Sequence, residues 1–354
     1  MSAAEFEEVT LLDTTLQTTI ANDANLIEVR NLHVHFPTHA GVVRAVNGAS
    51  YHLRAGETLG VVGESGSGKS VTALSILGLI GARSGRIVDG NIRFQGRDML
   101  AFTKAEMRRL RGNQISMIFQ DPMTSLNPVL TIGQQIAETI MLHQGVRAQQ
   151  ARERAVEMLN MVHISVPRAR LDEYPHQLSG GMRQRAMIAM ALACNPKVLI
   201  ADEPTTALDV TIQAQVLQLI VELQERLSMS VILITHDLGV IAETAKRVAV
   251  MYAGRVVEEA PTRELFKNPL HPYSRGLLGS MPKLVRGAAR TARLAEISGM
   301  VPSLREPIQG CSFAPRCGLA TTRCRREAPP MQIVSEDHRV ECWVVGDSGA
   351  RADV

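Results

Sequence analysis

The sequence predicts an α/β protein built on a parallel sheet, and three features indicate this class. A short apolar run, Thr58–Val62, leads into a glycine-rich loop and then into a helical pattern over 71–80. Two further runs, Val198–Ala201 and Val231–Ile234, are apolar and rich in β-branched residues, as buried parallel strands are. The helical pattern at 211–226 supplies the crossover that joins two parallel strands.

The rest of the chain divides by composition. Residues 1–25 are polar and acidic, so we expect a flexible lead-in. Strand and helix patterns fill 26–260, and the part from about 98 to 190 is expected to form a mainly helical subdomain. Prolines then interrupt a loop-rich extension over 261–345 that carries four cysteines, and a tail follows at 346–354.

Local patterns predict individual elements. Leu26–Val29 and a segment near His33–Phe36 are expected as two strands, and 248–257, with Gly254 near its middle, as a hairpin. In the helical part, four apolar side chains follow the i, i+3, i+4, i+7 spacing of one helix face: Ala155, Met158, Leu159 and Val162. Cys194, in an apolar context, is expected as a small core residue.

Bulk composition excludes several classes of function. The chain has 354 residues, a net charge of +3, and only 7 Phe, 4 Tyr and 1 Trp, so neither base stacking nor a basic field favours a nucleic-acid partner. The longest mainly apolar stretch, 71–82, is well short of the about 20 residues that span a bilayer. No Lys or Arg precedes Arg30, unlike a secretory signal. We therefore expect a cytosolic protein whose membrane association, if any, is peripheral.

The glycine-rich loop predicts a nucleotide site. It reads Gly-Glu-Ser-Gly-Ser-Gly-Lys-Ser at 63–70, the full phosphate-loop pattern in strand–loop–helix context. The glycines let successive N–H groups face phosphate oxygens at a helix N-terminus. Lys69 is expected to reach the β- and γ-phosphates and Ser70 to ligate Mg²⁺. The predicted nucleotide-binding residues are Gly63, Glu64, Ser65, Gly66, Ser67, Gly68, Lys69 and Ser70.

Polar residues at the ends of the neighbouring strands predict hydrolysis. Asp202 and Glu203 end the run at 198–201, where Asp202 can hold the metal through water and Glu203 can act as general base. His236 ends the next strand and is expected at the γ-phosphate. Gln120 follows a strand-like run at 115–119, from which its amide could touch both Mg²⁺ and the attacking water.

With Leu-Ser-Gly-Gly-Met-Arg-Gln-Arg at 178–185 and Ala-Leu-Asp at 207–209, these motifs resemble the ABC ATPase family throughout the nucleotide domain. The resemblance implies an ABC-type P-loop NTPase core with a β-subdomain and a helical subdomain, working as a head-to-tail pair that encloses two ATPs. Ser179, Gly180 and Gly181 would then contact the γ-phosphate held by the partner. It places Asp209 at the subunit seam and Phe36 against adenine.

The four late cysteines form a separate pattern, Cys311-x5-Cys317-x6-Cys324-x17-Cys342. Disulfides fit a cytosolic chain poorly. Structural zinc usually uses cysteine pairs about two to four residues apart, which this spacing lacks. Four thiolates on loose loops suit a [4Fe-4S] cluster, while zinc and unligated thiols remain as alternatives.

A narrower resemblance follows from Phe119–Pro128, from His271-Pro-Tyr273 and from the cysteine pattern. From about residue 26 to 343 the chain is similar to the ATPase subunits of bacterial oligopeptide and dipeptide importers. This implies a [4Fe-4S] cluster on the four cysteines and a sister ATPase subunit as partner. It also implies two permease subunits docked near the segment after Gln120, indirect work with an extracytoplasmic solute-binding protein, and a place at the cytoplasmic face of the inner membrane.

Two alternatives stay open. The same machine could import nickel or another small solute, because the solute never touches this subunit. A soluble ABC ATPase acting on nucleic acid or the ribosome belongs to another class. Such proteins commonly carry two cassettes or a long coiled-coil insertion, and this sequence has neither.

Overall fold

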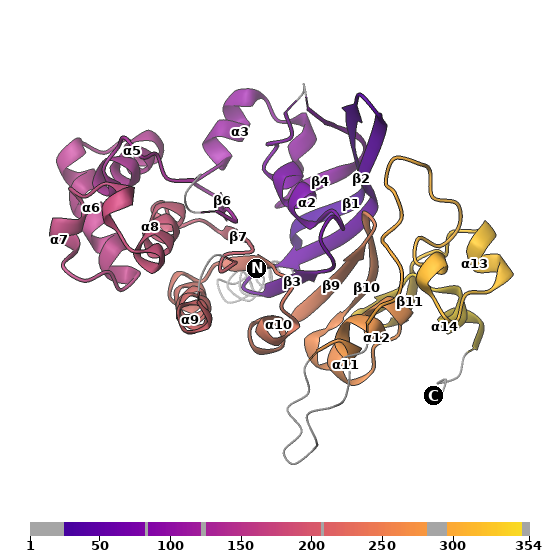
Figure 1. Ribbon diagram of the computed structural model, residues 1–354. Coiled ribbons are helices and arrows are strands. Elements are labelled where there is room, and N and C mark those ends of the chain that lie inside the picture. Colours follow the sequence, from indigo (N-terminus) through magenta and orange to yellow (C-terminus); the bar gives the residue numbers. More distant parts are fainter. Residues whose placement is uncertain (1–24, 82–83, 122–124, 207–208, 282–295, 349–354) are drawn as a thin grey trace, which may run out of the picture.

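The computed structural model describes residues 25–81, 84–121, 125–206, 209–281 and 296–348. These residues form two β-sheets with helices packed around them (Figure 1). The lead-in predicted over 1–25 lies outside these residues except for Asn25, and of the tail predicted over 346–354 only residues 346–348 are described.

The centre of the larger sheet is parallel. The strand β3 (Thr58–Val62) pairs with β8 (Ser230–Ile234) and β9 (Arg247–Tyr252), and β7 (Val198–Asp202) pairs with β8 and β6 (Ile115–Ile118). The sheet order is β11-β12-β10-β9-β3-β8-β7-β6, so β8 separates the phosphate-loop strand from the strand that ends in Asp202. Since parallel strands end at one edge, the segments that follow β3, β6, β7 and β8 meet there.

Antiparallel strands complete this sheet on the β9 side. The predicted hairpin is present as β9 and β10 (Arg255–Pro261), with Gly254 in its turn. Beyond it, β12 (His338–Val340) pairs with β10, and β11 (Gln332–Ser335) pairs with β12. Two strands of the C-terminal extension thus belong to the same sheet as the nucleotide loop, which the loop-rich sequence of the extension did not indicate.

The smaller sheet is antiparallel, in the order β2 (Gly41–Arg54), β1 (Asn25–Thr38), β4 (Arg86–Phe94) and β5 (Arg97–Asp98). The prediction of two separate strands within 26–36 is wrong, because β1 runs through that interval without ending. Asn31, at φ 47, lies where the register of β1 shifts against β2, so a local irregularity interrupts the alternation while pairing continues on both sides.

Two apolar cores cover the two faces of the larger sheet. Alternate strand residues enter each core; in β7, Leu199 and Ala201 join one and Val198 and Ile200 the other. The helix α2 (Lys69–Ile76) packs in the core shared with the smaller sheet. On the opposite face lie α9 (Val210–Leu227) and α10 (Leu238–Thr244). Burial on both faces explains why these strands are continuously apolar.

A helical lobe projects from the carboxyl edge of the sheet, at the left of Figure 1. It comprises α5 (Ile132–Gln144), α6 (Ala148–Met161), α7 (Pro167–Arg170) and α8 (Gly180–Leu192). The four residues predicted to share a helix face in the sequence around α6 are each 0% exposed, which confirms that prediction: Ala155, Met158, Leu159 and Val162. Cys194 is buried, as expected.

Shorter elements fill the connections. They are η1 (Met99–Ala101), α3 (Lys104–Leu110) and η2 (Pro175–Gln177), and in the C-terminal region α11 (Thr262–Lys267), α12 (Pro272–Gly279), η3 (Ala314–Arg316), α13 (Thr322–Arg326) and α14 (Trp343–Ser348).

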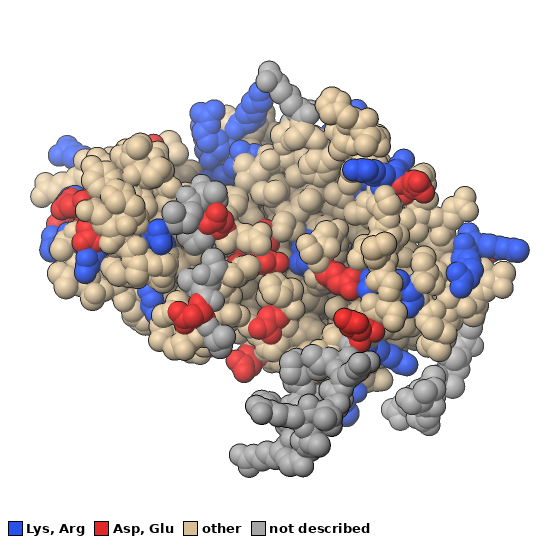
Figure 2. Space-filling model, viewed as in Figure 1, with Lys and Arg blue, Asp and Glu red and all other residues tan. Residues whose placement is uncertain are grey.

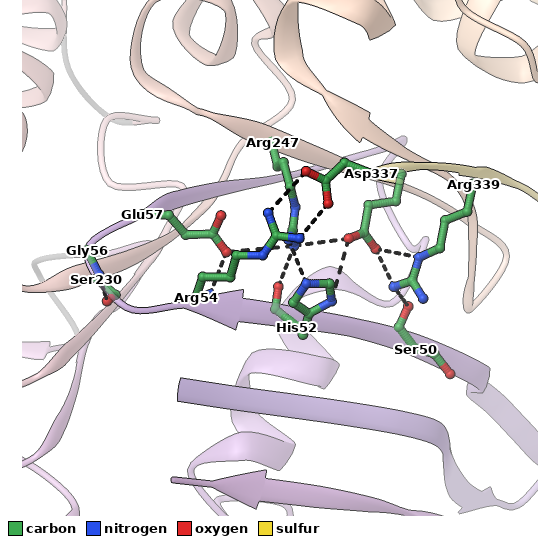
Figure 3. Close-up of polar contacts among 10 residues, drawn as sticks. Ser50, His52, Arg54, Gly56, Glu57, Ser230, Arg247, Asp337 and Arg339 are labelled. Atoms are coloured by element: carbon green, nitrogen blue, oxygen red, sulfur yellow. Dashed lines mark hydrogen bonds and ion pairs between the residues drawn. The ribbon is translucent and has the colours of Figure 1, made fainter. Parts of the chain in front are cut away.

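A buried charge network fastens the hairpin of β11 and β12 to the rest of the fold (Figure 3). Arg247, 3% exposed, pairs with Glu259 at 3.0 Å and donates to the carbonyl oxygen of His52 at 2.7 Å. From the hairpin, Arg339 donates to Glu259 and Asp337 accepts from Arg54. Burial, reinforced by Arg247, lowers the pKa of His52 to about 3, so this imidazole is neutral within the network.

On the face drawn in Figure 2, acidic side chains gather across the middle and lower middle, whereas Lys and Arg side chains group above the centre and at the right. Within the described ranges, no helix combines the length and the apolar character needed to cross a membrane.

Candidate nucleotide site

The loop between β3 and α2 has the backbone that a phosphate-binding loop requires. Gly63 has φ 153, and a Cβ there would lie 2.1 Å from the carbonyl oxygen of Met251. Gly68, with φ 99, caps α2, and a Cβ there would lie 2.6 Å from the carbonyl oxygen of Ala45. Both positions therefore need glycine, for conformation and for space.

Lys69 is the first residue of α2, directly after this loop. It is 6% exposed, and its Nζ donates to the carbonyl oxygens of Gly63 at 2.7 Å and Glu64 at 3.1 Å. Burial lowers the pKa of Lys69, whereas the carboxylates of Glu203, Asp202 and Glu64 oppose that shift. The ammonium group is thus held among oxygen atoms, where a phosphate oxygen can replace a carbonyl partner.

Ser70 and Asp202 meet as the sequence predicts for a Mg²⁺ site. The Ser70 hydroxyl donates to Oδ1 of Asp202 at 3.0 Å. Asp202 is 5% exposed, and burial raises its pKa, although the Ser70 hydrogen bond acts in the opposite direction. A buried carboxylate beside a hydroxyl is a hard-oxygen donor set that suits Mg²⁺, whose charge would offset the cost of burial.

The predicted catalytic side chains also gather at this edge. Gln120 donates to Oε2 of Glu203 at 3.0 Å, and Nδ1 of His236 lies 3.5 Å from Oε1 of Glu203. The Glu203 backbone has φ 46, and its N–H donates to the carbonyl oxygen of Ile234 at 2.8 Å. Three strands, β6, β7 and β8, thereby deliver an amide, a carboxylate and an imidazole to one place.

Ser179, Gly180 and Gly181 form the exposed start of α8. The Ser179 hydroxyl caps the helix by accepting from the N–H of Met182 at 3.3 Å. A Cβ at Gly180 would have no atom within 4 Å, so the backbone here is open to close approach. The 13-residue helix adds its positive N-terminal end to that opening.

The other two predicted contact residues have structural partners of their own. Asp209 caps α9, where its carboxylate accepts from the N–H of Ile212 at 2.9 Å. Phe36 is half-buried against the core, and its ring lies next to Gly85. Residues 207–208, which precede Asp209, and 122–124, which follow Gln120, lie outside the described residues.

The four late cysteines approach one another without forming a metal centre. All are free thiols; Cys324 and Cys342 are buried, and the N–H of Cys311 donates to the carbonyl oxygen of Cys324 at 2.7 Å. Burial raises the pKa of Cys311 to about 11 and also raises the pKa of Cys317 and Cys342. The part of the chain that the structure describes holds no group of three or more His, Cys, Asp or Glu placed to bind a metal. The predicted [4Fe-4S] cluster is therefore not supported.

Three contacts of the site were not predicted, one of them local and two between residues far apart in the sequence. Thr206 donates to Glu203 at 2.9 Å, Gln184 of α8 donates to the carbonyl oxygen of Pro204, and Arg316 of the C-terminal region pairs with Glu64 at 2.7 Å. Gln184 belongs to the Leu-Ser-Gly-Gly-Met-Arg-Gln-Arg motif at 178–185, but that motif does not predict its hydrogen bond to Pro204. Nothing in the spacing of Arg316 points to residue 64.

Sequence comparisons agree with this geometry. An ABC transporter family model matches residues 46–206, and a model of the oligopeptide/dipeptide transporter C-terminal region matches residues 257–324. A probable peptide ABC transporter ATP-binding protein of Sinorhizobium fredii is 56% identical over 318 residues, which cover 90% of this chain and 94% of the relative. The oligopeptide transport ATP-binding protein AppD of Bacillus subtilis is 50% identical, covering 92% of this chain and 99% of its own.

Solved structures agree on the cassette. The ATP-binding cassette MJ0796, solved as a dimer in a post-hydrolysis state with ADP and Pi, is 28% identical with a TM-score of 0.60, covering 67% of this chain and 99% of its own. The cbiO1 protein of Clostridium perfringens, part of an ABC transporter complex, is 26% identical with a TM-score of 0.59, covering 70% of this chain and 92% of its own.

The fold and the site together define an ABC-type ATPase cassette, a class whose catalytic groups lie at the carboxyl edge of a parallel sheet. More narrowly, this chain belongs to the ABC transporter ATP-binding proteins that carry the oligopeptide/dipeptide transporter C-terminal region. Subunits of this family are ATPases that drive transport.

Proposed function

We propose that this chain hydrolyses ATP to drive the uptake of oligopeptides or dipeptides across the cytoplasmic membrane. The observation that carries the proposal is the meeting of Ser70 with Asp202 and of Gln120 and His236 with Glu203 at one sheet edge. The names of the relatives AppD and DppD, the oligopeptide and dipeptide transport ATP-binding proteins of Bacillus subtilis, support the choice of solute.

Each group has a proposed role in hydrolysis. Lys69 and the N–H groups of the loop at 63–70 bind the phosphates, and Ser70, Asp202 and Gln120 hold Mg²⁺. When bound, Mg²⁺ neutralises charge on the β- and γ-phosphates. Glu203 accepts a proton from the attacking water, and His236, 65% exposed, contacts the γ-phosphate.

The chain is proposed to act in a head-to-tail pair of ATPase subunits. The exposed start of α8 has an open backbone at Gly180 and a helix N-terminus, which together suit the γ-phosphate bound by a second subunit. Asp209 would lie at the seam, and Phe36 would stack on adenine. A sister subunit is favoured over a second copy, and the dimer of MJ0796 gives a precedent for the pairing.

The remaining partners follow from this role. Two permease subunits would dock on the helical subdomain at about 98–190, near the segment after Gln120, and an extracytoplasmic solute-binding protein would deliver the peptide. The chain would then sit peripherally at the cytoplasmic face of the inner membrane. Residues 26–260 would form the ATPase domain and 261–345 a C-terminal domain specific to peptide importers.

An iron–sulfur cluster on Cys311, Cys317, Cys324 and Cys342 forms no part of the proposed mechanism, because the thiols do not fit a metal as they stand. Anaerobically purified protein decides the matter. Iron in the preparation together with a broad absorbance near about 400 nm would restore the cluster, and their absence would leave four free thiols.

Transport is tested by isolating the chain from its native membranes and identifying what accompanies it. We expect two integral membrane permeases and a second ATPase, with ATP-dependent uptake of labelled di- and tripeptides in the reconstituted complex. Uptake of Ni²⁺ in place of peptide would reassign the solute. Recovery of the chain without any integral membrane protein would refute the importer assignment.

A further inference from the structure

The C-terminal region reaches the phosphate-binding loop through one ion pair. Arg316, in η3, donates to both carboxylate oxygens of Glu64, from Nη1 at 2.7 Å and from Nη2 at 3.0 Å. The two residues are 252 positions apart in sequence. This bidentate geometry is the strongest form of an arginine–carboxylate contact, and it fixes direction as well as distance.

Arg316 is held in place by groups other than Glu64. Its side chain is only 5% exposed, and it donates to the carbonyl oxygens of Ile297 at 2.9 Å and Ser298 at 3.1 Å. Its guanidinium lies over the rings of Tyr252 and Phe313, at 5.8 and 6.0 Å. The hydrogen bonds to Glu64 raise the pKa of Arg316, so the charge is permanent. A guanidinium anchored in this way can position its partner.

Glu64 is also fixed through its backbone. Its N–H donates to the hydroxyl oxygen of Tyr273 at 2.8 Å, and Tyr273 is 0% exposed. Its carbonyl oxygen accepts from Lys69 at 3.1 Å. Tyr273 packs against Tyr252 and Phe313, with ring centroids 4.6 and 5.4 Å away. Elements on both sides of the 282–295 interval thus converge on one residue of the loop.

If the Glu64 carboxylate lost its contact with Arg316, it would lower the affinity of the loop for nucleotide. The backbone carbonyl oxygen of Glu64 already contacts the Lys69 ammonium group at 3.1 Å, so its carboxylate belongs to a residue that adjoins Lys69 directly. Without Arg316, this carboxylate would be free to pair with Lys69 and to repel the phosphates that Lys69 is expected to bind. The bidentate pair directs it toward the C-terminal region instead and neutralises it.

We propose that Arg316 is a positioning residue for the nucleotide site, which holds Glu64 away from Lys69 and so sets the affinity of the loop for ATP. This inference rests on the proposed ATP site, but not on the solute or on the permeases. It assigns the C-terminal region a role in nucleotide binding, because that region supplies the guanidinium group that fixes the Glu64 carboxylate of the phosphate-binding loop.

The test compares ATP affinity in four forms of the full chain, by equilibrium binding of ATP with Mg²⁺. Arg316→Met should weaken binding on the order of tenfold, because it frees the carboxylate while keeping the bulk of the side chain. Glu64→Gln alone supplies the reference level for the double variant, because its side chain carries no negative charge for Arg316 to hold. The double variant should recover to the level of Glu64→Gln, and added salt should shrink the defect of Arg316→Met.

Arg339→Met is the matched control, because it breaks another ion pair between the C-terminal region and the sheet, with Glu259, away from the loop. It should lower thermal stability and leave ATP affinity unchanged. Unaltered affinity in Arg316→Met, or a double variant as weak as Arg316→Met, would overturn the assignment. Failure of every form to bind ATP, the unaltered chain included, would instead refute the proposed ATP site.

Discussion

The side-chain amide of Gln184 in α8 donates a hydrogen bond to the backbone carbonyl oxygen of Pro204, the residue that follows Glu203. Gln184 is 1% exposed, so water cannot replace this bond. The helix α8, which Ser179 caps, is thereby tied to the loop that carries the proposed general base. A movement of α8 toward a second subunit would therefore displace the backbone next to Glu203.

The first prediction concerns this bond. Gln184→Met keeps the volume but leaves the Pro204 carbonyl oxygen unpaired, which should lower the free energy of unfolding by about 1–3 kcal/mol. ATP turnover should fall further than stability explains, because Glu203 loses its support. Gln135→Met is the control: it breaks buried hydrogen bonds to Asn127 and Leu130, outside the catalytic edge. Equal turnover losses in both variants would show that Gln184 acts only through stability.

The second prediction addresses the general base. Glu203→Gln should retain ATP binding, because the phosphate contacts at 63–70 are untouched, and should lose hydrolysis by a factor on the order of 10²–10⁴. Single-turnover release of phosphate in the assembled complex measures the effect. Glu225→Gln is the control: it makes the same chemical change at an exposed residue of α9, away from the catalytic edge. Turnover by Glu203→Gln within about tenfold of the unaltered protein would remove the base assignment.

The third prediction separates metal binding from stability at Asp202. Burial raises the pKa of Asp202 above its usual 3.8, so this group favours the folded state at low pH and that contribution is lost as pH rises through the raised pKa. Asp202→Asn should therefore increase the thermal stability of the nucleotide-free protein at neutral pH. The same variant should lose the additional stabilisation that ATP with Mg²⁺ provides.

Thermal melts with and without ATP and Mg²⁺ test both halves of this prediction. Ser70→Ala is the companion variant: it should lose the Mg²⁺-dependent stabilisation without the gain in the nucleotide-free form, because Asp202 loses a hydrogen bond and stays charged. A nucleotide-free Asp202→Asn that melts below the unaltered protein would contradict the burial argument.

The fourth prediction concerns acid stability. The pKa of His52 in the fold, about 3, is below its ordinary 6.5, so neutral His52 stabilises the fold above pH 6.5 and this contribution is lost as pH falls toward 3. His52→Gln removes the titration and should flatten the decline by up to about 1.4 kcal/mol per pH unit in that window. Urea unfolding at several pH values measures it, with the exposed His39→Gln as control. An unchanged slope in His52→Gln would mean that other groups govern acid unfolding.

The larger features of the fold could be predicted because their signals are local. Continuous β-branched runs predicted β7 and β8, since strands buried on both faces have no polar alternation. Periodicity predicted the buried face that includes Ala155 and Leu159. The two strands expected within β1 failed for a local reason as well: the shift at Asn31 breaks the pattern without ending the pairing.

The sequence by itself determined the phosphate loop and the residues at the strand ends, because each depends on backbone conformation and spacing over a few residues. Only the tertiary structure decided which distant side chains complete them. Arg316 meets Glu64, Gln184 meets Pro204, and β12 joins the sheet beside β10, through contacts that depend on sheet order and packing. The cysteine pattern marks the limit of spacing, because a metal centre also needs its ligands in a shared geometry, and the described residues hold no group of three or more His, Cys, Asp or Glu placed to bind a metal.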